Sequence, residues 1–275
     1  MRARCAIRAL FFCLYAWFGS AHGAGIEATV APAVLDFGYK EYADSGALLN
    51  REDGPLPGLV MELARRFGAW RLSGEGRLFS GTVDHVGQTN LGVPITTRTD
   101  EKLYALTLRI AREVNIGSAQ IAPYVGYGYQ EWHRSIDATH TSAGAPVSGL
   151  SEVYTWKVAE IGALVSALRY GRFTGGVDVR VFRVVDPEVR VRFTTGFDDA
   201  RLSLGEKSGR HLGLSGTYML AERTRVRVDF YQERWAFGRS SSEQLTSGGA
   251  IVGSVFEPRS ETRNTGLNVG VTLDF

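Results

Sequence analysis

The residues that could carry out chemistry lie in polar segments far apart in the sequence. His85, His133 and Asp137 combine two imidazoles and a carboxylate, groups that act as general bases in hydrolysis. If their segments meet at one rim of the fold, they could form a hydrolytic site. Polar side chains in connecting segments are more commonly just solvated, so catalysis is the secondary hypothesis, and non-enzymatic character is the main one.

Nothing in the sequence predicts a metal site or a cofactor. His133 and His140 share no spacing that would fix both on one metal ion. No HExxH, P-loop or GxSxG motif occurs. Both cysteines, Cys5 and Cys13, lie in the first 23 residues, which we expect to be removed. Thiolate ligands, disulfides and cysteine nucleophiles are therefore not expected in the mature chain.

Charged residues of both signs recur at alternate positions of several segments, which would place them on one face of a strand. Facing a common interior, they would form a network of ion pairs: Glu62, Arg71, Glu75, Arg77, Arg109, Asp178, Arg180, Arg225, Arg227 and Asp229. Pairing is expected because an unpaired charge removed from water is very costly. The network could hold the fold shut, or it could line a narrow charged pore.

The elements that would position these residues are β-strands with a period of two. The clearest is at the C-terminus, where apolar Leu267, Val269, Val271, Leu273 and Phe275 alternate with Asn268, Gly270, Thr272 and Asp274. This alternation is typical of a strand with one face in lipid and the other toward a polar interior.

Ten segments carry this alternation. The sequence therefore predicts an all-β fold, an antiparallel up-and-down transmembrane β-barrel of ten strands, with eight or twelve as alternatives. Short connections near residues 67–69, 115–118, 170–171 and 221–223 alternate with long polar ones at 43–56, 83–100, 134–152, 185–210 and 237–262. Residues 59–67 and 101–114 also fit a helix, and residues 153–168 are interpreted as a strand with a bulge near Glu160. Aromatic residues near the strand ends, among them Tyr39, Trp132, Trp156 and Trp235, would form interfacial girdles.

The first residues have the pattern of a secretory signal peptide. Arg2, Arg4 and Arg8 precede or border a short apolar run at 9–18, and small residues follow at 19–24. The run is too short to cross a bilayer as a helix, which needs about 20 residues. We predict that residues 1–23 are a cleaved signal peptide and that residues 24–275 form a single barrel domain.

The charge balance argues against a nucleic-acid partner. The chain has 31 basic and 29 acidic residues, and removal of the three signal arginines leaves a net charge of −1. A near-neutral mature chain lacks the basic footprint that nucleic-acid binding requires.

The predicted signal peptide, the cysteine-free mature chain and the alternating C-terminal strand 266–275 together resemble Gram-negative outer-membrane β-barrel proteins. The resemblance implies export to the outer membrane, contact with its lipid and lipopolysaccharide, and recognition of terminal Phe275 by the barrel-assembly machinery. A ten-stranded topology also resembles that of the omptin outer-membrane proteases, although a shared fold does not transfer an activity.

These observations favour a non-enzymatic, integral outer-membrane barrel with a role in envelope structure, surface interaction or restricted solute passage. Its specificity would reside in the five long loops, whose extracellular ligand the sequence does not identify. The alternative is an outer-membrane hydrolase of omptin-like topology, with an active site at the extracellular rim around His85, His133 and Asp137. A soluble secreted β-sandwich is a third possibility, because some segments also fit helices.

Overall fold

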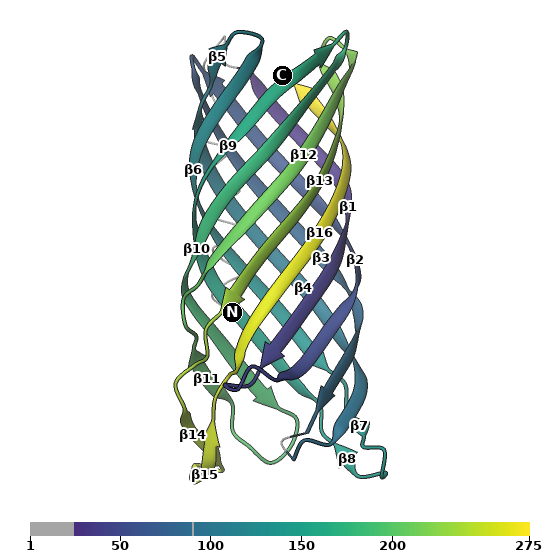
Figure 1. Ribbon diagram of the computed structural model, residues 1–275, viewed down its shortest axis with the longest axis vertical. Helices are drawn as coiled ribbons and strands as arrows, with labels where there is room; N and C mark the ends of the chain where they lie inside the picture. The colour runs from purple at the N-terminus through teal and green to yellow at the C-terminus, as the bar shows by residue number, and fades with distance from the viewer. Residues whose placement is uncertain (1–24, 90) are drawn as a thin grey trace.

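The computed structural model describes residues 25–89 and 91–275, and the predicted signal peptide at 1–23 lies outside them. The fold is a closed antiparallel barrel in which each long strand pairs with its neighbours in the chain and the first pairs with the last (Figure 1). The ten long strands are β1 (Ile26–Tyr42), β2 (Leu48–Phe67), β3 (Trp70–Gln88), β4 (Pro94–Arg112), β6 (Ala119–Ile136), β9 (Leu150–Tyr170), β10 (Phe173–Phe193), β12 (Ser208–Ala221), β13 (Thr224–Phe237) and β16 (Arg259–Asp274). The prediction of ten up-and-down strands is confirmed.

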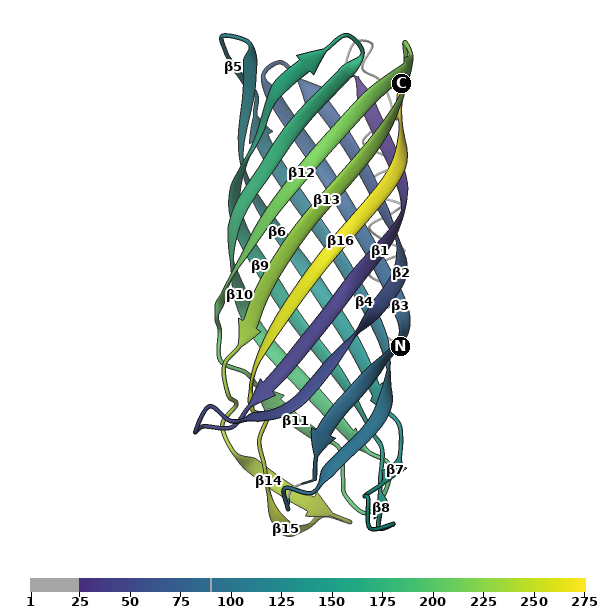
Figure 2. The ribbon, with the colours of Figure 1, turned by 45° about the vertical axis from the view of Figure 1, so that its right-hand side comes forward.

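The two ends of the barrel differ in their connections. One end, here called the short-turn end, carries tight turns in which Gly68, Gly117 and Gly171 adopt φ near +60°, a conformation that favours glycine. The short strand β5 (Val114–Ile116) and the C-terminus lie there too. The opposite, long-loop end carries the remaining short strands: β7 (Thr139–His140), β8 (Pro146–Val147), β11 (Ala200–Ser203), β14 (Glu243–Ser247) and β15 (Ala250–Val255) (Figure 2).

The strands extend further into the long connections than the sequence predicts. β2 begins at Leu48, β6 continues to Ile136 and β10 continues to Phe193, all within segments that we expected to be loops. β11 pairs with the extension of β10, so it does not add a spanning hairpin and the twelve-strand alternative is wrong. The expected alternation is lost at these ends because outward residues there, such as Lys40 and Arg51, are as polar as inward ones.

The segments with ambiguous patterns are all strands. Residues 59–67 belong to β2 and most of 101–114 belongs to β4, so the helical reading is wrong there. β9 is one continuous strand. Its pairing with β10 is irregular at two places, at Ala167 on β9 and between Val185 and Glu188 on β10, and neither is at Glu160. Within the described residues no helix is long and apolar enough to cross a membrane.

The two faces of the wall follow the predicted alternation. On β16, Leu267, Val269 and Val271 are 41–48% exposed, whereas Asn268 and Thr272, which alternate with them, are 6% and 5% exposed. An apolar outer face and a polar inner face are what a barrel in hydrocarbon requires. The class of fold is therefore that of an outer-membrane β-barrel.

The aromatic residues are divided between the two faces, which corrects the prediction of girdles. Tyr104 and Tyr129 lie on the outer face, but Tyr39, Trp132, Trp156 and Trp235 are at most 5% exposed and point inward. The period of two explains this outcome, because Trp132 is three residues from outward-facing Tyr129. These inward rings form the apolar layer of the barrel interior.

Candidate functional site

Interlocking ion pairs line the interior near the short-turn end, beside a cavity of about 300 Å³ that Glu27, Arg66 and Arg225 border. Glu27 lies 3.0 Å from Arg66 and 3.3 Å from both Arg71 and Arg225. Glu62 lies 2.7 Å from Arg71 and 3.1 Å from Arg227. Arg227 also pairs with Asp229, and Arg225 with Asp274. Each of these charged side chains therefore has at least one partner of opposite charge.

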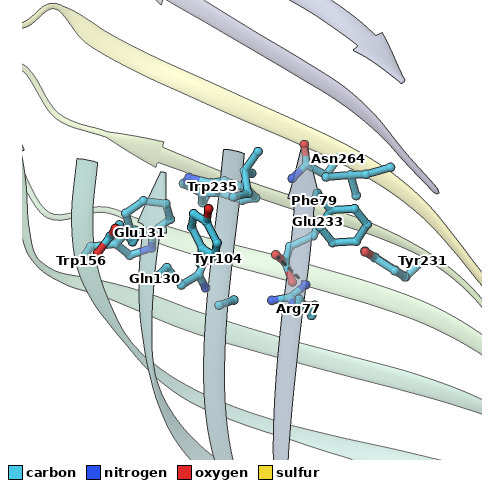
Figure 3. Close-up of a pocket in the computed structure, with 13 residues that line it drawn as sticks. Arg77, Phe79, Tyr104, Gln130, Glu131, Trp156, Tyr231, Glu233, Trp235 and Asn264 are labelled. Carbon is cyan, nitrogen blue, oxygen red and sulfur yellow. Dashed lines mark ion pairs between the residues drawn. The ribbon is translucent and has the colours of Figure 1, made fainter. Parts of the chain in front are cut away.

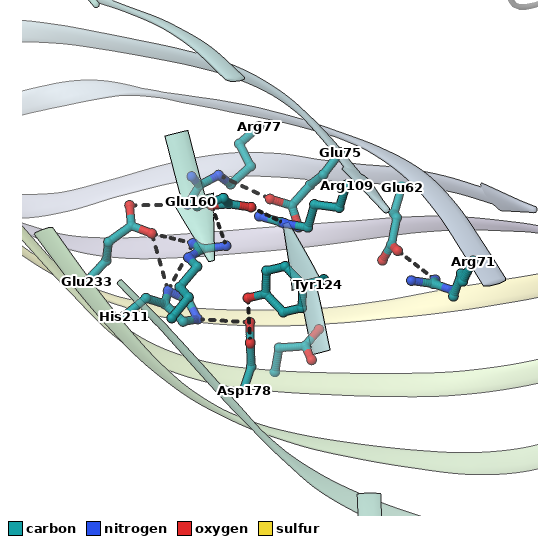
Figure 4. A network of polar contacts seen from close by, with 12 residues as sticks. Glu62, Arg71, Glu75, Arg77, Arg109, Tyr124, Glu160, Asp178, His211 and Glu233 are labelled. Carbon is teal, nitrogen blue, oxygen red and sulfur yellow. Dashed lines mark hydrogen bonds and ion pairs between the residues drawn. The ribbon is translucent and has the colours of Figure 1, made fainter. Parts of the chain in front are cut away.

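A second network occupies the middle of the barrel (Figure 4). Arg109 joins Glu75 at 3.3 Å and Glu160 at 2.5 Å, and Arg180 joins Glu160 and Glu233. Two further groups complete it at one side. His211 lies 3.2 Å from Glu233 and 3.6 Å from Asp178, and the hydroxyl of Tyr124 donates a 2.7 Å hydrogen bond to Asp178. Several arginines share several carboxylates, so the network ties strands on different sides of the barrel together.

An apolar layer lies between this network and the long-loop end. Trp132 stacks on Tyr154 with ring centroids 4.7 Å apart, and Trp156 contacts Phe237 edge-on at 5.2 Å. Trp132 and Tyr154 have no exposed surface and Phe237 has 1%. Side chains that lined an open aqueous pore would be exposed. The layer therefore closes the lumen.

A small cavity marks where the apolar layer meets the middle network (Figure 3). Its volume is about 20 Å³, and Arg77, Trp156, Tyr231 and Glu233 are among its lining residues. A space of this size holds about one water molecule. It does not provide a continuous path for a solute.

A third polar cluster, here called the glutamate cluster, lies beyond the aromatic rings at the long-loop end. Its centre is Arg134, which is 1% exposed and lies 2.8 Å from Glu52, 2.5 Å from Glu152 and 3.3 Å from Glu41. The guanidinium also lies over the ring of Tyr39, 4.5 Å from its centroid. The remaining members of the cluster are Glu101 and Glu257. One arginine therefore faces five glutamates.

Glu257 enters this cluster from a loop and not from a strand. It follows β15, is 5% exposed, and its carboxylate accepts a 2.6 Å hydrogen bond from the hydroxyl of Tyr154. Its backbone N–H donates to Ser240 Oγ, and Ser240 N–H donates back to its carbonyl. Burial, and then the nearby charges of Glu152 and Glu41, raise the pKa of the Glu257 carboxyl well above its ordinary value.

The structure does not bring the candidate catalytic residues together. His85 points inward, is 3% exposed, and its Nδ1 lies 2.7 Å from Glu52, which also accepts a hydrogen bond from Thr99. His133 points outward, 2.6 Å from Glu131, and Asp137 follows the end of β6. The two histidines are thus on opposite sides of the wall, because residue 133 has the outward parity of Tyr129. The three side chains are therefore not brought to one place.

The ten charges predicted to face the interior all do so. They are Glu62, Arg71, Glu75, Arg77, Arg109, Asp178, Arg180, Arg225, Arg227 and Asp229. Nine of them pair with a charged partner in the two networks, and Asp178 instead accepts a hydrogen bond from Tyr124 and lies 3.6 Å from His211. Sequence reasoning missed the glutamate cluster, because most of its residues lie in strand ends that resembled loops and Glu257 lies in a loop. In a barrel, neighbouring strands pair along their whole length, so a strand that continues past the lipid implies that its partner continues too. This rule would have placed the cluster's strand residues in the wall.

Two other predictions concern single sites. Terminal Phe275 is 69% exposed, and its N–H donates to the carbonyl of Ile26, which fastens the chain end to β1. Its recognition by the assembly machinery stays a prediction. Among the described residues no three His, Cys, Asp or Glu side chains are arranged to hold a metal ion.

Comparison with known proteins supports the fold but supplies no family. No protein-family model matches the chain, and no curated protein is significantly similar in sequence. Among solved structures, the outer membrane protease OmpT from Escherichia coli superposes with a TM-score of 0.64 at 13% identity, covering 92% of this chain and 96% of that one. The outer membrane protein OprG from Pseudomonas aeruginosa matches with a TM-score of 0.40 at 13% identity, covering 92% and 96%. At these identities the likeness to OmpT concerns the fold.

Proposed function

We propose that this protein is a closed barrel of the Gram-negative outer membrane that presents an ordered surface at its long-loop end and does not conduct solutes. In this orientation the short turns and the C-terminus face the periplasm and the long-loop end faces outward, as is usual for such barrels. Export by the predicted signal peptide fits this placement.

The observation that carries the proposal is the closed interior. A ten-stranded barrel is only slightly wider than an eight-stranded one, whose interior side chains already fill the lumen. Here the rings of Trp132, Tyr154 and Phe237 are completely or almost completely buried across that lumen. Of the three roles expected from the sequence, this supports envelope structure and surface interaction over solute passage.

The order of the long loops supports surface interaction. The β14–β15 hairpin is fastened to the loop after β10, because the carboxylate of Asp198 accepts hydrogen bonds from the N–H groups of Gly249 (3.0 Å) and Gly248 (3.2 Å). The hydrogen bonds from Gly249, from the Thr246 side chain and from Gly248 lower the pKa of Asp198. Hairpins held in one arrangement present a fixed surface to a partner, which limits the entropy lost on binding.

Single-channel recording in planar bilayers tests the closure. The inserted wild-type barrel should give no steady conductance steps under conditions in which a general porin, used as the positive control, gives them. A Trp132→Ala, Trp156→Ala double variant should show current where the wild type shows none, because it removes two rings of the apolar layer. Steady, reproducible steps from the wild-type protein would overturn the proposal.

A further inference from the structure

The outer face of β6 carries a carboxylate, an imidazole and a hydroxyl in a row. Glu131, His133 and Ser135 are alternate residues of this strand, and the buried side chains of Trp132 and Arg134 lie between them in sequence. Because successive side chains of a strand point to opposite faces, all three lie on the outer face of the wall. The set is here called the wall triad, and β6 pairs with β4 on one side of it and with β9 on the other.

Two members of the wall triad are in contact. Nε2 of His133 lies 2.6 Å from Glu131 Oε1, and the hydroxyl of Tyr129 donates a 3.2 Å hydrogen bond to Glu131 Oε2. An ionised carboxylate only accepts hydrogen bonds, so it holds the proton of the neutral imidazole on Nε2 and leaves Nδ1 as an acceptor. An imidazole that a carboxylate orients in this way is prepared to take a proton from a hydroxyl.

The hydroxyl of Ser135 comes from the other side of the imidazole along the strand. Residues two apart on a strand are separated by about 7 Å, a distance that the side chains of Glu131 and His133 bridge. Ser135 has the same separation from His133. Its Oγ is 3.4 Å from Ser151 Oγ on β9, a long contact that rotation of the Ser135 side chain releases. In sites without substrate, the hydrogen bond between nucleophile and base is often still long or unformed.

The wall triad begins where the apolar band of the outer wall ends. Toward the short-turn end, the next outward residues are Tyr129 and Tyr127 on β6 and Leu106 on β4, all of which are exposed. Toward the long-loop end, the outward residues of β4 are polar, as at Lys102 and Asp100. The ester bonds of membrane lipids lie at such a border, between the acyl chains and the polar head groups. The triad therefore faces the level at which lipid esters are found.

We propose that the wall triad hydrolyses a carboxylic ester of a lipid in the leaflet that surrounds the long-loop end. Ser135 Oγ bonds to the acyl carbon while its proton passes to Nδ1 of His133. The ester C–O bond then breaks, and the lipid alcohol leaves with that proton. Water attacks the acyl-serine in the same manner, which releases the fatty acid and restores Ser135. Ser135 and His133 are catalytic residues, and Glu131 is a positioning residue that holds the imidazole.

Lys102 is suited to stabilise the negative charge that develops on the carbonyl oxygen. It lies on β4 directly opposite His133, and the Cβ atoms of directly opposed residues are about 5 Å apart. A cation beside the reacting carbonyl lowers the energy of the oxyanion. The side chain of His133 is 41% exposed, so a lipid can reach it from the membrane. The reaction uses the outer wall and not the lumen, so the inference goes beyond the proposed function and does not depend on the closed interior.

The test measures the fatty acid that the refolded barrel releases in detergent micelles containing a diacyl phospholipid or, in a separate arm, lipid A. Release from one arm alone assigns the lipid, and release from both assigns the shared ester chemistry. We expect Ser135→Ala and His133→Gln to lower the initial rate at least about a hundredfold, and Lys102→Met to lower it at least about tenfold. Ser151→Ala is the matched control, because it removes an outward serine of the neighbouring strand, and its rate should stay within about threefold of wild type.

Two further measurements separate chemistry from folding. A fluorophosphonate probe should modify Ser135 of the wild type, as located by peptide mass spectrometry, and should not modify the His133→Gln variant. Glu131→Gln removes the charge that orients the imidazole, so it should lower kcat about tenfold with KM unchanged. A heat-modifiable shift on electrophoresis shows that each variant is folded.

The proposal is overturned by any of three results. They are the absence of both lipid hydrolysis and probe labelling in the folded wild type, full activity of Ser135→Ala, and labelling at Ser151 in place of Ser135. Conductance recordings report on the lumen alone, so this proposal and the proposed function can fail separately.

Discussion

The two halves of the barrel interior solve the problem of buried charge in different ways. Toward the short-turn end and in the middle, arginines and carboxylates are interleaved, so that Glu75 pairs with Arg109 and Arg77, and Glu160 with Arg109 and Arg180. In the glutamate cluster, four carboxylates lie within 3.9 Å of the guanidinium of Arg134, and a fifth, that of Glu257, is held by Tyr154. The first arrangement is redundant. The second depends on one arginine and on the raised pKa of the Glu257 carboxyl.

The largest expected effect comes from removing that one residue. Arg134→Met leaves Glu52 and Glu152 buried without their cation, and breaking a buried pair in this way costs about 3–5 kcal/mol. The free energy of unfolding, measured by urea denaturation in detergent or vesicles, should fall by this amount. The loss of ordered structure should be concentrated at the long-loop end, because Arg134 joins β6 to β1, β2 and β9 there.

Arg109→Met is the matched comparison in the middle network. It also removes a buried arginine, but Glu75 keeps Arg77 at 3.5 Å and Glu160 keeps Arg180 at 3.6 Å. We expect a smaller loss of about 1–3 kcal/mol, the range for an imperfectly satisfied buried polar group. If Arg109→Met destabilised the barrel as much as Arg134→Met, the distinction between a redundant and a dependent network would be wrong.

An intermediate effect is expected from pH, through Glu257. Burial raises its pKa, so the folded state holds a proton that the ordinary carboxyl releases, and the docked loop is favoured in acid. Above the ordinary value of 4.5, the stabilisation should decline as pH rises through the raised pKa. On ionisation, Glu257 would meet Glu152 and Glu41, with Arg134 as the cation and Tyr154 as the hydrogen-bond donor.

Hydrogen exchange of residues 238–258, corrected for the intrinsic effect of pH, measures this docking. Exchange in the wild type should become faster relative to the barrel strands as pH rises from about 5 to 8. Glu257→Gln cannot ionise and keeps an acceptor for Tyr154, so its protection should vary less with pH. An Asp198→Asn variant serves as the control. Asp198 anchors the same hairpin and its pKa is lowered, so it stays ionised over this pH range, and the variant should keep the pH dependence of the wild type. The same pH profile in wild type and Glu257→Gln would contradict the assignment.

The sequence predicted the redundant networks but not the dependent cluster, for a physical reason. In the lipid-spanning part, outward residues such as Leu106 and Leu108 are apolar, so the polarity of Thr107 or Arg109 reveals the inward face. Beyond the lipid both faces are polar, as at Arg51, Glu52 and Asp53, and the period of two disappears from the hydropathy pattern. In this region the pairing with the neighbouring strand, and not the hydropathy pattern, shows that β2 continues.

Parity alone could have corrected two other predictions. Once Tyr127 and Tyr129 are assigned to the outer face, Trp132 must face inward and His133 outward as long as the strand continues. The inward position of Trp132 follows from that count, and the same count on β3 places His85 inward, on the other side of the wall from His133. Parity does not predict which inward side chains meet across the lumen. Those contacts depend on the tilt of the strands and on the register with which β1 pairs with β16 to close the barrel.

The smallest expected effect is at the exposed edge of the redundant network. Arg66 pairs with Glu27 at 3.0 Å and with Glu113 at 3.1 Å, but its side chain is 44% exposed. Glu27 retains Arg71 and Arg225 when Arg66 is removed. Arg66→Ala should therefore lower the free energy of unfolding by about 1 kcal/mol or less, as for most exposed ion pairs.

Salt separates this edge from the glutamate cluster. In 1 M salt the Debye length is about 3 Å, so the difference between Arg66→Ala and wild type should nearly vanish. The deficit of Arg134→Met should persist, because ions do not reach a guanidinium that is 1% exposed. If added salt rescued Arg134→Met as well, water and ions would have access to the cluster. Its dependence on one arginine would then be a property of low ionic strength and not of burial.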